Sequence, residues 1–433
     1  MNKLQKNEKG AWKWIPTLYF AEGIPYVVVM VVSGIMYKRL GLSNTDNTLL
    51  TGLISFVWVF KGLWSPFVDL YRTKRWWIIT TQLLIGAGLG GIALLLPAPF
   101  YLQATLVLFI LLAFSSATHD IAADGFYMLA LDESKQSFFV GIRSTFYRFA
   151  NILGQGVLIM FAGWLEKTTG NIRYSWSITF FVLAGIFLAL FAYHRFALPN
   201  TEMAAKQISR SREEKSPFLE TFVSFFKKKQ IIAALCFMLL YRFGEAFLVK
   251  ISSLFMLDGR ETGGLGFSTE QVGFVYGTVG VIALTVGGII GGIAVSRKGL
   301  KFWLLPMALC ITIPHLAYVY LAYCQPADFW LINSAVAIEQ FGYGFGFTAY
   351  MMYLIYFAEG PHKTAHYAIC TAFMALSMSL PGMAAGWLQE QMGYEHFFVF
   401  IMICSLATWA VIPFLKIDKS FGKKKINDAG ANK

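Results

Sequence analysis

The sequence predicts an all-α membrane protein with twelve transmembrane helices arranged in two six-helix bundles. The 433-residue chain is 57% hydrophobic and only 14% charged, whereas soluble proteins carry about 25% charged residues. Apolar runs long enough to cross a bilayer, about 20 residues each, recur along most of the chain. One long polar segment near the middle separates these runs into two sets of equal number.

Taken in order, the predicted spans of the first set cover residues 14–36, 48–70, 76–97, 101–131, 138–164 and 174–196. Those of the second set cover residues 231–256, 270–295, 301–323, 328–357, 364–388 and 395–415. We therefore expect an N-terminal bundle over 1–196, a cytoplasmic linker loop over 197–230, a C-terminal bundle over 231–416 and a basic cytoplasmic tail over 417–433. The first run follows a short basic segment and is long for a signal-peptide core, so we interpret it as an uncleaved span.

The distribution of lysine and arginine predicts the orientation, because basic loops remain on the cytoplasmic side of a membrane. The basic segments on one side are 3–13, 72–75, 195–229, 297–301 and 416–433, with Lys135, Arg143 and Lys363. The other side holds only Lys38, Arg39, Lys167, Arg173 and Arg260. Both termini and the middle loop are therefore predicted to be cytoplasmic, and the net charge of +12 implies no nucleic-acid partner.

The two halves of the chain resemble each other at an offset of 223 residues. Residues 162–165 and 385–388 both have the sequence AGWL, and residues 127–128 and 350–351 are both YM. The same offset relates Glu22 to Glu245. Because each half has an even number of spans, the repeats run in the same direction through the membrane. This arrangement is typical of the major facilitator fold, in which substrate binds near the midplane between the halves.

Other function classes find little support in the sequence. The five cysteines are isolated, with no CxxC or metal-ligand spacing, and no histidine has ligand spacing, so we expect neither cofactor nor metal. No GxxxxGK[ST] motif is present, which argues against ATP-driven transport by this chain alone. We find no nucleophile–base pattern, so an enzyme is the weaker hypothesis.

The stretch from Ala117 to Tyr127 carries the strongest functional signal. Asp120, Asp124 and Tyr127 follow i, i+4, i+7 spacing and share one helix face. An ionised carboxylate at membrane depth costs at least roughly 2.5–3.5 kcal/mol, so such residues commonly mark ion or substrate pathways. As like charges one turn apart, the two aspartates should not both ionise easily. We predict proton coupling; the alternative is an aspartate pair that holds the bundle closed with basic neighbours.

The first span places Tyr19, Glu22 and Tyr26 on one face. Glu22 is predicted to couple protons or bind substrate, with a structural ion pair as the alternative, and the two tyrosines are candidate sugar-stacking residues. Asp69 at the end of the second span and Arg72, which follows it, are predicted to gate the cytoplasmic side.

In the fifth span, Arg148, Asn151 and Gln155 share a helix face and are candidate substrate-binding residues. Arg148 cannot lose its charge, so it must face water, an anionic ligand or a carboxylate. Asp120 or Asp124 is its expected partner. Lys61 in the second span is deeply placed, although a lysine can extend its charge to the interface.

The second half offers candidates in the seventh and tenth spans. Arg242 and Glu245 are three residues apart and either satisfy each other or, with Tyr241, line a site. Glu339, Gln340 and Tyr343 adjoin a run of alternating glycines and aromatic residues over 341–347, which favours close helix approach and ring stacking.

Several of these segments resemble the AmpG-like muropeptide permease family of the major facilitator superfamily. They are YFAEGIP at 19–25, WSPFVD at 64–69, DIAADG at 120–125, YRFGE at 241–245, GFSTEQVG at 266–273 and EQFGYG at 339–344. The resemblance implies proton-driven import of N-acetylglucosaminyl-anhydro-N-acetylmuramic acid or its peptides across the bacterial inner membrane. It also implies functional roles for Glu22, Asp120, Asp124, Arg242 and Glu245.

We therefore predict a monomeric proton-coupled carrier of a cell-wall muropeptide, in which Arg148 and Arg242 face a cargo carboxylate. Two alternatives remain open. One is an importer of another oligosaccharide or small anion on the same fold. The other is a membrane sensor or enzyme on a transporter scaffold, which the absence of any large soluble segment disfavours.

Overall fold

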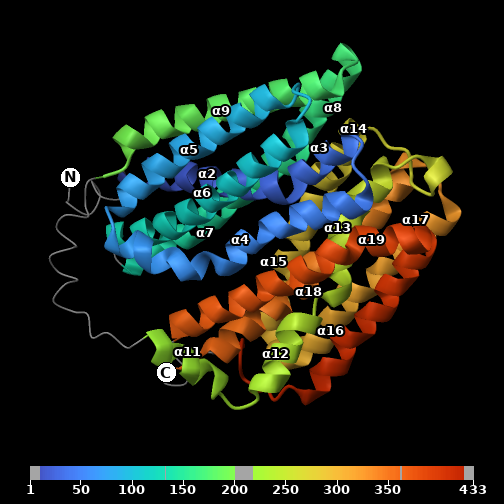
Figure 1. Ribbon diagram of the computed structural model, residues 1–433. Helices are drawn as coiled ribbons and strands as arrows, with labels where there is room; N and C mark the ends of the chain where they lie inside the picture. The colour runs from blue at the N-terminus through green and yellow to red at the C-terminus, as the bar shows by residue number, and fades with distance from the viewer. Residues whose placement is uncertain (1–9, 132, 200–217, 361–362, 424–433) are drawn as a thin grey trace, which may run out of the picture. The chain divides into compact units, whose positions relative to one another are not determined.

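The computed structural model describes residues 10–131, 133–199, 218–360 and 363–423, and these residues form helices and no strands (Figure 1). Helices of the first half are α2 (Ile15–Val27), η1 (Val28–Val32), α3 (Ser33–Arg39), α4 (Asn44–Leu70), α5 (Lys74–Leu95), α6 (Tyr101–Ala130), α7 (Glu133–Ile152), η2 (Leu153–Leu158), α8 (Ile159–Thr169) and α9 (Ile172–Ala197). Because α2, η1 and α3 are continuous, as are α7, η2 and α8, these ten elements make six helical rods.

The second half begins with α11 (Phe218–Phe226), a helix inside the predicted linker loop. It continues with α12 (Ile231–Leu240), α13 (Phe243–Leu257), η3 (Arg260–Thr262), α14 (Thr269–Phe274), η4 (Val275–Gly280), α15 (Val281–Lys298), α16 (Leu300–Thr312), η5 (Ile313–His315), α17 (Leu316–Cys324), α18 (Phe329–Ala358), α19 (Lys363–Val411) and η6 (Ile412–Phe414). Within α19, Gly393 has φ 73° and ψ 164°, which interrupts the helix between the last two predicted spans.

Among the described residues, nine helical segments are long and apolar enough to cross a membrane. Because one of them is the interrupted α19, they account for ten of the twelve predicted spans. The other two predicted spans are α4 and α18, helices of 27 and 30 residues. The mean hydropathy of α4 is lowered by Asp46 and Lys61, and that of α18 by its glycines and aromatic residues.

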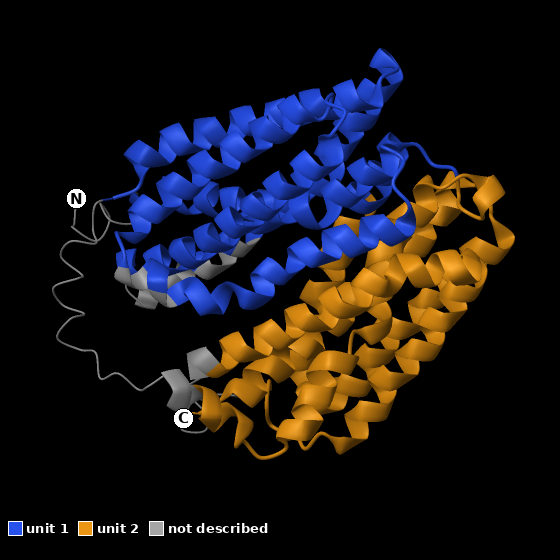
Figure 2. Cartoon of the chain, in the orientation of Figure 1, with its two compact units in different colours: residues 1–215, 266–278 blue, residues 216–265, 279–433 orange. Residues whose placement is uncertain are grey.

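The chain divides into two compact units, unit 1 with residues 1–215 and 266–278 and unit 2 with residues 216–265 and 279–433 (Figure 2). The predicted bundle boundaries stay predictions, but α14, which follows the seventh span, is part of unit 1. Its Thr269 hydroxyl donates to Glu166 Oε2 at 2.8 Å, and Arg39 reaches the same oxygen at 3.0 Å. Glu166 therefore ties α14 to α3 and α8.

Helix starts follow the local sequence, because a side-chain oxygen at the N-cap accepts one of the otherwise unpaired amide protons of the first turn. Five described helices, α4, α5, α9, α14 and α18, begin in this way. Their N-cap residues are Ser43, Thr73, Asn171, Ser268 and Asp328. Polar residues in the short connections thus determine where these apolar helices begin.

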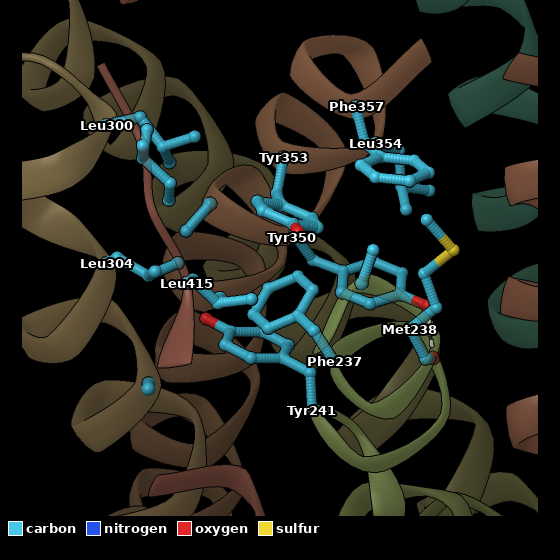
Figure 3. Close-up of a cluster of buried hydrophobic side chains, with 14 of the residues drawn as sticks. Phe237, Met238, Tyr241, Leu300, Leu304, Tyr350, Tyr353, Leu354, Phe357 and Leu415 are labelled. Atoms are coloured by element: carbon cyan, nitrogen blue, oxygen red, sulfur yellow. Dashed lines mark hydrogen bonds between the residues drawn. The ribbon is translucent and has the colours of Figure 1, made fainter. Parts of the chain in front are cut away.

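The core of unit 2 is dominated by aromatic side chains (Figure 3). Tyr241 and Tyr350 stack with ring centroids 5.4 Å apart, and Phe237 lies 4.7 Å from Tyr241. Each tyrosine hydroxyl donates to a backbone carbonyl, that of Tyr241 to Gly346 at 3.0 Å and that of Tyr350 to Met238 at 2.6 Å. The polar ends of the rings are therefore satisfied inside the core, as buried tyrosines require.

The alternating glycines of α18 let it approach two neighbouring helices closely, as the sequence predicted. A Cβ added at Gly344 would lie 2.0 Å from the Leu284 carbonyl oxygen of α15, and one at Gly342 would lie 2.0 Å from the Cys310 carbonyl of α16. A Cβ at Gly287 of α15 would lie 2.2 Å from the Phe341 carbonyl. Backbone atoms of α15 and α18 thus meet directly at these glycines.

Replacing Gly344 with alanine is expected to destabilise the protein by about 1–3 kcal/mol, the usual cost of overpacking a tight contact. Gly292→Ala on α15 is the matched control, because nothing lies within 4 Å of its added Cβ. Thermal unfolding of the purified variants measures the difference. Equal melting temperatures for the two variants would contradict the backbone contact at Gly344.

Candidate functional site

Unit 1 places three acidic side chains near two cations that come from other helices. Asp120 of α6 forms an ion pair with Lys61 of α4, and Asp124 Oδ1 lies 2.8 Å from Arg143 Nη2 of α7. The i, i+4 spacing predicted that both aspartates share a face, and the structure gives each its own cation. The expected pairing with Arg148 is wrong: Arg148 is exposed and, among the described residues, pairs with neither aspartate.

Glu22 of α2 completes this acidic group without a cation of its own. Its residue is 7% exposed, its Oε2 atom has no partner among the described residues, and Asp120 and Asp124 act on it as neighbouring like charges. Like charges at close range disfavour ionisation of all three carboxyl groups. Glu22 is therefore a place where unit 1 can hold one proton.

Arg143 lies between two tyrosine rings as well as beside a carboxylate. Its guanidinium carbon is 4.3 Å from the Tyr19 ring centroid and 5.2 Å from that of Tyr127. The Tyr19 hydroxyl donates to Asp124 Oδ1 at 3.2 Å. The carboxylate and the rings together hold the guanidinium by charge and by cation–π attraction.

A buried polar chain supports α6 just before Asp120. The Gln82 side chain of α5 bridges two buried histidines, at 3.0 Å from His119 Nε2 and 3.0 Å from His194 Nδ1 of α9. The Thr17 hydroxyl of α2 lies 2.9 Å from His194 Nε2. These bonds link α2, α5, α6 and α9 and fix the rotation of α6, so they position the carboxylate face.

In unit 2 a buried arginine, Arg242, pairs with no carboxylate of the described residues. Arg242 lies in the break between α12 and α13, and its Nη2 donates to the Tyr343 hydroxyl. Its guanidinium carbon is 4.8 Å from the Phe347 ring centroid, and its Nε atom has no described partner. Among the described residues no acid pairs with Arg242, which is 6% exposed. The predicted alternative, a pair with Glu245, is wrong.

The repeat offset relates the two arginine clusters. Tyr19 of unit 1 corresponds to Arg242 of unit 2, and Tyr127 corresponds to Tyr350. In unit 1 the arginine from α7 stacks on both tyrosines, whereas in unit 2 the arginine itself occupies the Tyr19 position and lies 5.9 Å from the Tyr350 ring. Both units therefore keep a cation over an aromatic ring at equivalent places, but among the described residues a neutralising acid is found in unit 1 and not in unit 2.

Glu245 and Glu339 lie elsewhere in unit 2, both fully buried. Glu245 Oε2 is 2.9 Å from His315 Nε2, and the other imidazole nitrogen of His315 is 3.2 Å from Ser405 Oγ. Glu339 Oε2 accepts from its neighbour Gln340 at 3.0 Å. The histidine was not a predicted site residue.

The remaining predicted residues are distributed around these clusters. Tyr26 is 36% exposed, with its ring edge on Trp58, and Asn151 and Gln155 are half-buried. Tyr241 packs in the core of unit 2, where its ring is fully buried and its hydroxyl donates to the Gly346 carbonyl; its predicted substrate contact stays a prediction. The Asp69 side chain lies outside the described residues; Arg72 is exposed, with its guanidinium over Trp76.

Sequence reasoning missed Arg143 and His315. Arg143 lies five residues before Arg148, and the sequence alone gives no reason to prefer one of them as the partner of Asp124. His315 follows Pro314 and ends the short helix η5, which lies within the ninth predicted span. The sequence did place His315 and Glu245 deep within two apolar runs, and this was the only indication that they could interact.

A family model described as Major Facilitator Superfamily matches residues 17–379. The chain belongs to the major facilitator superfamily. Within it, the AmpG-like resemblance is confirmed. The chain is 26% identical over 410 residues to the putative transporter AmpG 4 of Rickettsia conorii, covering 92% of this chain and 94% of that one. It is 24% identical over 418 residues to the anhydromuropeptide permease of Escherichia coli K12, covering 95% and 80%.

Solved structures confirm the predicted fold. The nucleoside transporter NupG matches with a TM-score of 0.68 at 13% identity, covering 93% of this chain and 98% of that one. A D-xylose–proton symporter matches with a TM-score of 0.66 at 14% identity, covering 96% and 99%. The protein is therefore a multi-pass membrane transporter of the major facilitator type.

Proposed function

We propose that this transporter imports peptidoglycan-derived N-acetylglucosaminyl-anhydro-N-acetylmuramic acid, or its peptides, across the bacterial inner membrane by proton-coupled alternating access. The similarity to the anhydromuropeptide permease of Escherichia coli supports this cargo, because it extends over 95% of the chain. The predicted topology places both termini in the cytoplasm and the functional unit is a monomer. No reaction on the cargo is part of the proposal.

The observation that carries the proposal is the buried Arg242, which pairs with no acid among the described residues. A buried guanidinium without a counter-charge is costly, so the site favours an anionic ligand that can complete it. The muramyl or peptide carboxylate of the cargo supplies such a charge, and charge-assisted hydrogen bonds to arginine are among the stronger polar contacts. Tyr343, which contacts Arg242, offers a ring beside the same position.

Proton coupling is assigned to the carboxyl groups of unit 1. In this proposal Glu22 carries the proton, while Lys61 and Arg143 balance Asp120 and Asp124. If the proton leaves, a second ionised carboxylate appears next to Asp120, and the group then carries one more negative charge than before. The added charge is stabilised to a different extent in the outward-open and the inward-open conformation. Protonation therefore shifts the equilibrium between these two conformations, as proton coupling requires.

The test is uptake of labelled N-acetylglucosaminyl-anhydro-N-acetylmuramic acid into proteoliposomes, with and without an inward proton gradient. We expect uptake that the gradient stimulates and that excess unlabelled cargo inhibits. Counterflow exchange separates a carrier from a sensor or enzyme, because only a carrier exchanges substrate across the membrane. No uptake by folded protein under either condition would refute the muropeptide cargo.

A further inference from the structure

Unit 2 contains a second group of buried titratable side chains that proton coupling in unit 1 does not use. Glu245 of α13, His315 of η5 and Glu339 of α18 are 2%, 1% and 1% exposed. They come from three different elements of unit 2. Burying a charged side chain costs free energy unless it is paired. The protonation state of each of these residues must therefore be considered.

The hydrogen bonds around His315 determine how many protons its pair holds. The Ser405 hydroxyl donates to the Ile401 carbonyl at 2.9 Å, so it accepts from His315 Nδ1 at 3.2 Å. His315 therefore carries a hydrogen on Nδ1, and one further proton lies between its Nε2 and Glu245 Oε2, 2.9 Å apart. Whether the pair is imidazole with acid or imidazolium with carboxylate, it holds that proton.

The helix packing fixes this geometry. Gly244 allows α13 to approach α19 at Ser405, since a Cβ there would lie 2.5 Å from Ser405 Oγ and 3.0 Å from the Ile401 carbonyl. The next residue, Glu245, is thereby brought to His315. The position of the pair thus follows from backbone contact and not from a flexible side chain.

Glu339 is buried near this pair, and no described lysine or arginine pairs with it. Its Oε2 accepts from Gln340 at 3.0 Å, and Glu245 acts on it as a neighbouring charge. The Oε1 atoms of Glu339 and Glu245 are both buried and have no partner in the described part of the chain.

Arg242, three residues before Glu245, has other contacts. Its guanidinium contacts the Tyr343 hydroxyl and aromatic rings. Within the residues that the structure describes, neither Glu245 nor Glu339 pairs with a lysine or an arginine. Removing an ionised carboxylate from water without such a partner costs several kcal/mol.

We propose that Glu245, His315 and Glu339 form a second proton-binding site, with one proton on Glu339 and one shared by Glu245 and His315. This site goes beyond the proposed function, which assigns coupling to unit 1. It also does not depend on the cargo. The transporter can therefore hold protons in both units.

Infrared spectroscopy of the full-length protein in lipid nanodiscs at neutral pH tests this site, because protonated carboxyl groups have a carbonyl band that carboxylates lack. The spectrum of the wild type minus that of Glu339→Gln is expected to show loss of one acid carbonyl band. Glu395→Gln is the matched control, since Glu395 is an exposed acid of unit 2. Its difference spectrum should show only loss of carboxylate bands.

Glu245→Gln tests the shared proton in the same way. The substitution should remove a second acid band if the proton lies on Glu245. If the proton lies on His315, it should remove a carboxylate band and an imidazolium band. Either result shows that the Glu245–His315 pair holds the proton. Loss of carboxylate bands alone in both glutamate variants, with folded and monodisperse protein, would overturn the proposal. So would an acid band in the wild type that disappears on adding Na⁺, since a metal ion would then be the occupant.

Discussion

Replacing Glu22 with glutamine is expected to abolish gradient-driven accumulation of the labelled muropeptide and to preserve counterflow exchange. Glutamine keeps the size of the side chain and can donate to Asp120, but it cannot release a proton. We expect accumulation to fall at least about tenfold, which corresponds to roughly 1.4 kcal/mol of lost coupling. Uptake into proteoliposomes with and without an inward proton gradient measures this loss.

Asp46→Asn is the control for this substitution, because Asp46 is an exposed acid in the first turn of α4. It should retain gradient-driven accumulation. Asp124→Asn is a different test, since it removes the carboxylate that neutralises Arg143 and should weaken exchange as well as accumulation. Unchanged accumulation by Glu22→Gln would show that the proton coupling resides elsewhere.

Replacing Arg242 with glutamine is expected to weaken binding of a carboxylate-bearing cargo by about 10- to 100-fold. The estimate follows from the roughly 1.5–3 kcal/mol that a hydrogen bond to a charged group contributes. Arg242→Lys should restore part of the affinity, because it keeps the charge and loses the planar fork. Concentration dependence of counterflow exchange measures the change.

The same cargo with its carboxyl group reduced to an alcohol separates charge recognition from packing. It should lose little affinity when Arg242 is replaced. Arg260→Gln is the protein control, because Arg260 is an exposed arginine whose contacts are the backbone carbonyls of Gln325 and Pro326. Equal losses for both cargoes would mean that Arg242 has a structural role.

The positions of the helices could be predicted from the sequence, whereas the partners of their charged residues could not. Length and apolar character define a span, so ten predicted spans meet those criteria and the other two are long helices. Pairing depends instead on which helix face meets which neighbour. Arg143 and Arg148 are five residues apart, about 140° around a helix of 3.6 residues per turn, so only one of them can face Asp124.

The same limit explains the outcome in unit 2. Three-residue spacing made an Arg242–Glu245 pair plausible within one helix. The structure interrupts the helix at Tyr241 and Arg242, so the two side chains diverge, one toward α18 and one toward η5. His315 is separated from Glu245 by 70 residues, and only the fold shows that they meet. The glycine run was more informative, because small residues on a helix imply close neighbours wherever those neighbours lie in the sequence.

The backbone contact between α15 and α18 also has a mechanical consequence. Where the backbones meet at Gly287 and Gly344, no side chain separates the two helices, and the Thr348 hydroxyl of α18 also donates to the Gly288 carbonyl of α15. We therefore expect α15 and α18 to move together as one rigid pair. Deformation within unit 2 should then concentrate where helical hydrogen bonding is already interrupted. One such place is the break at Tyr241 and Arg242, which would make the candidate anion-binding arginine part of a hinge.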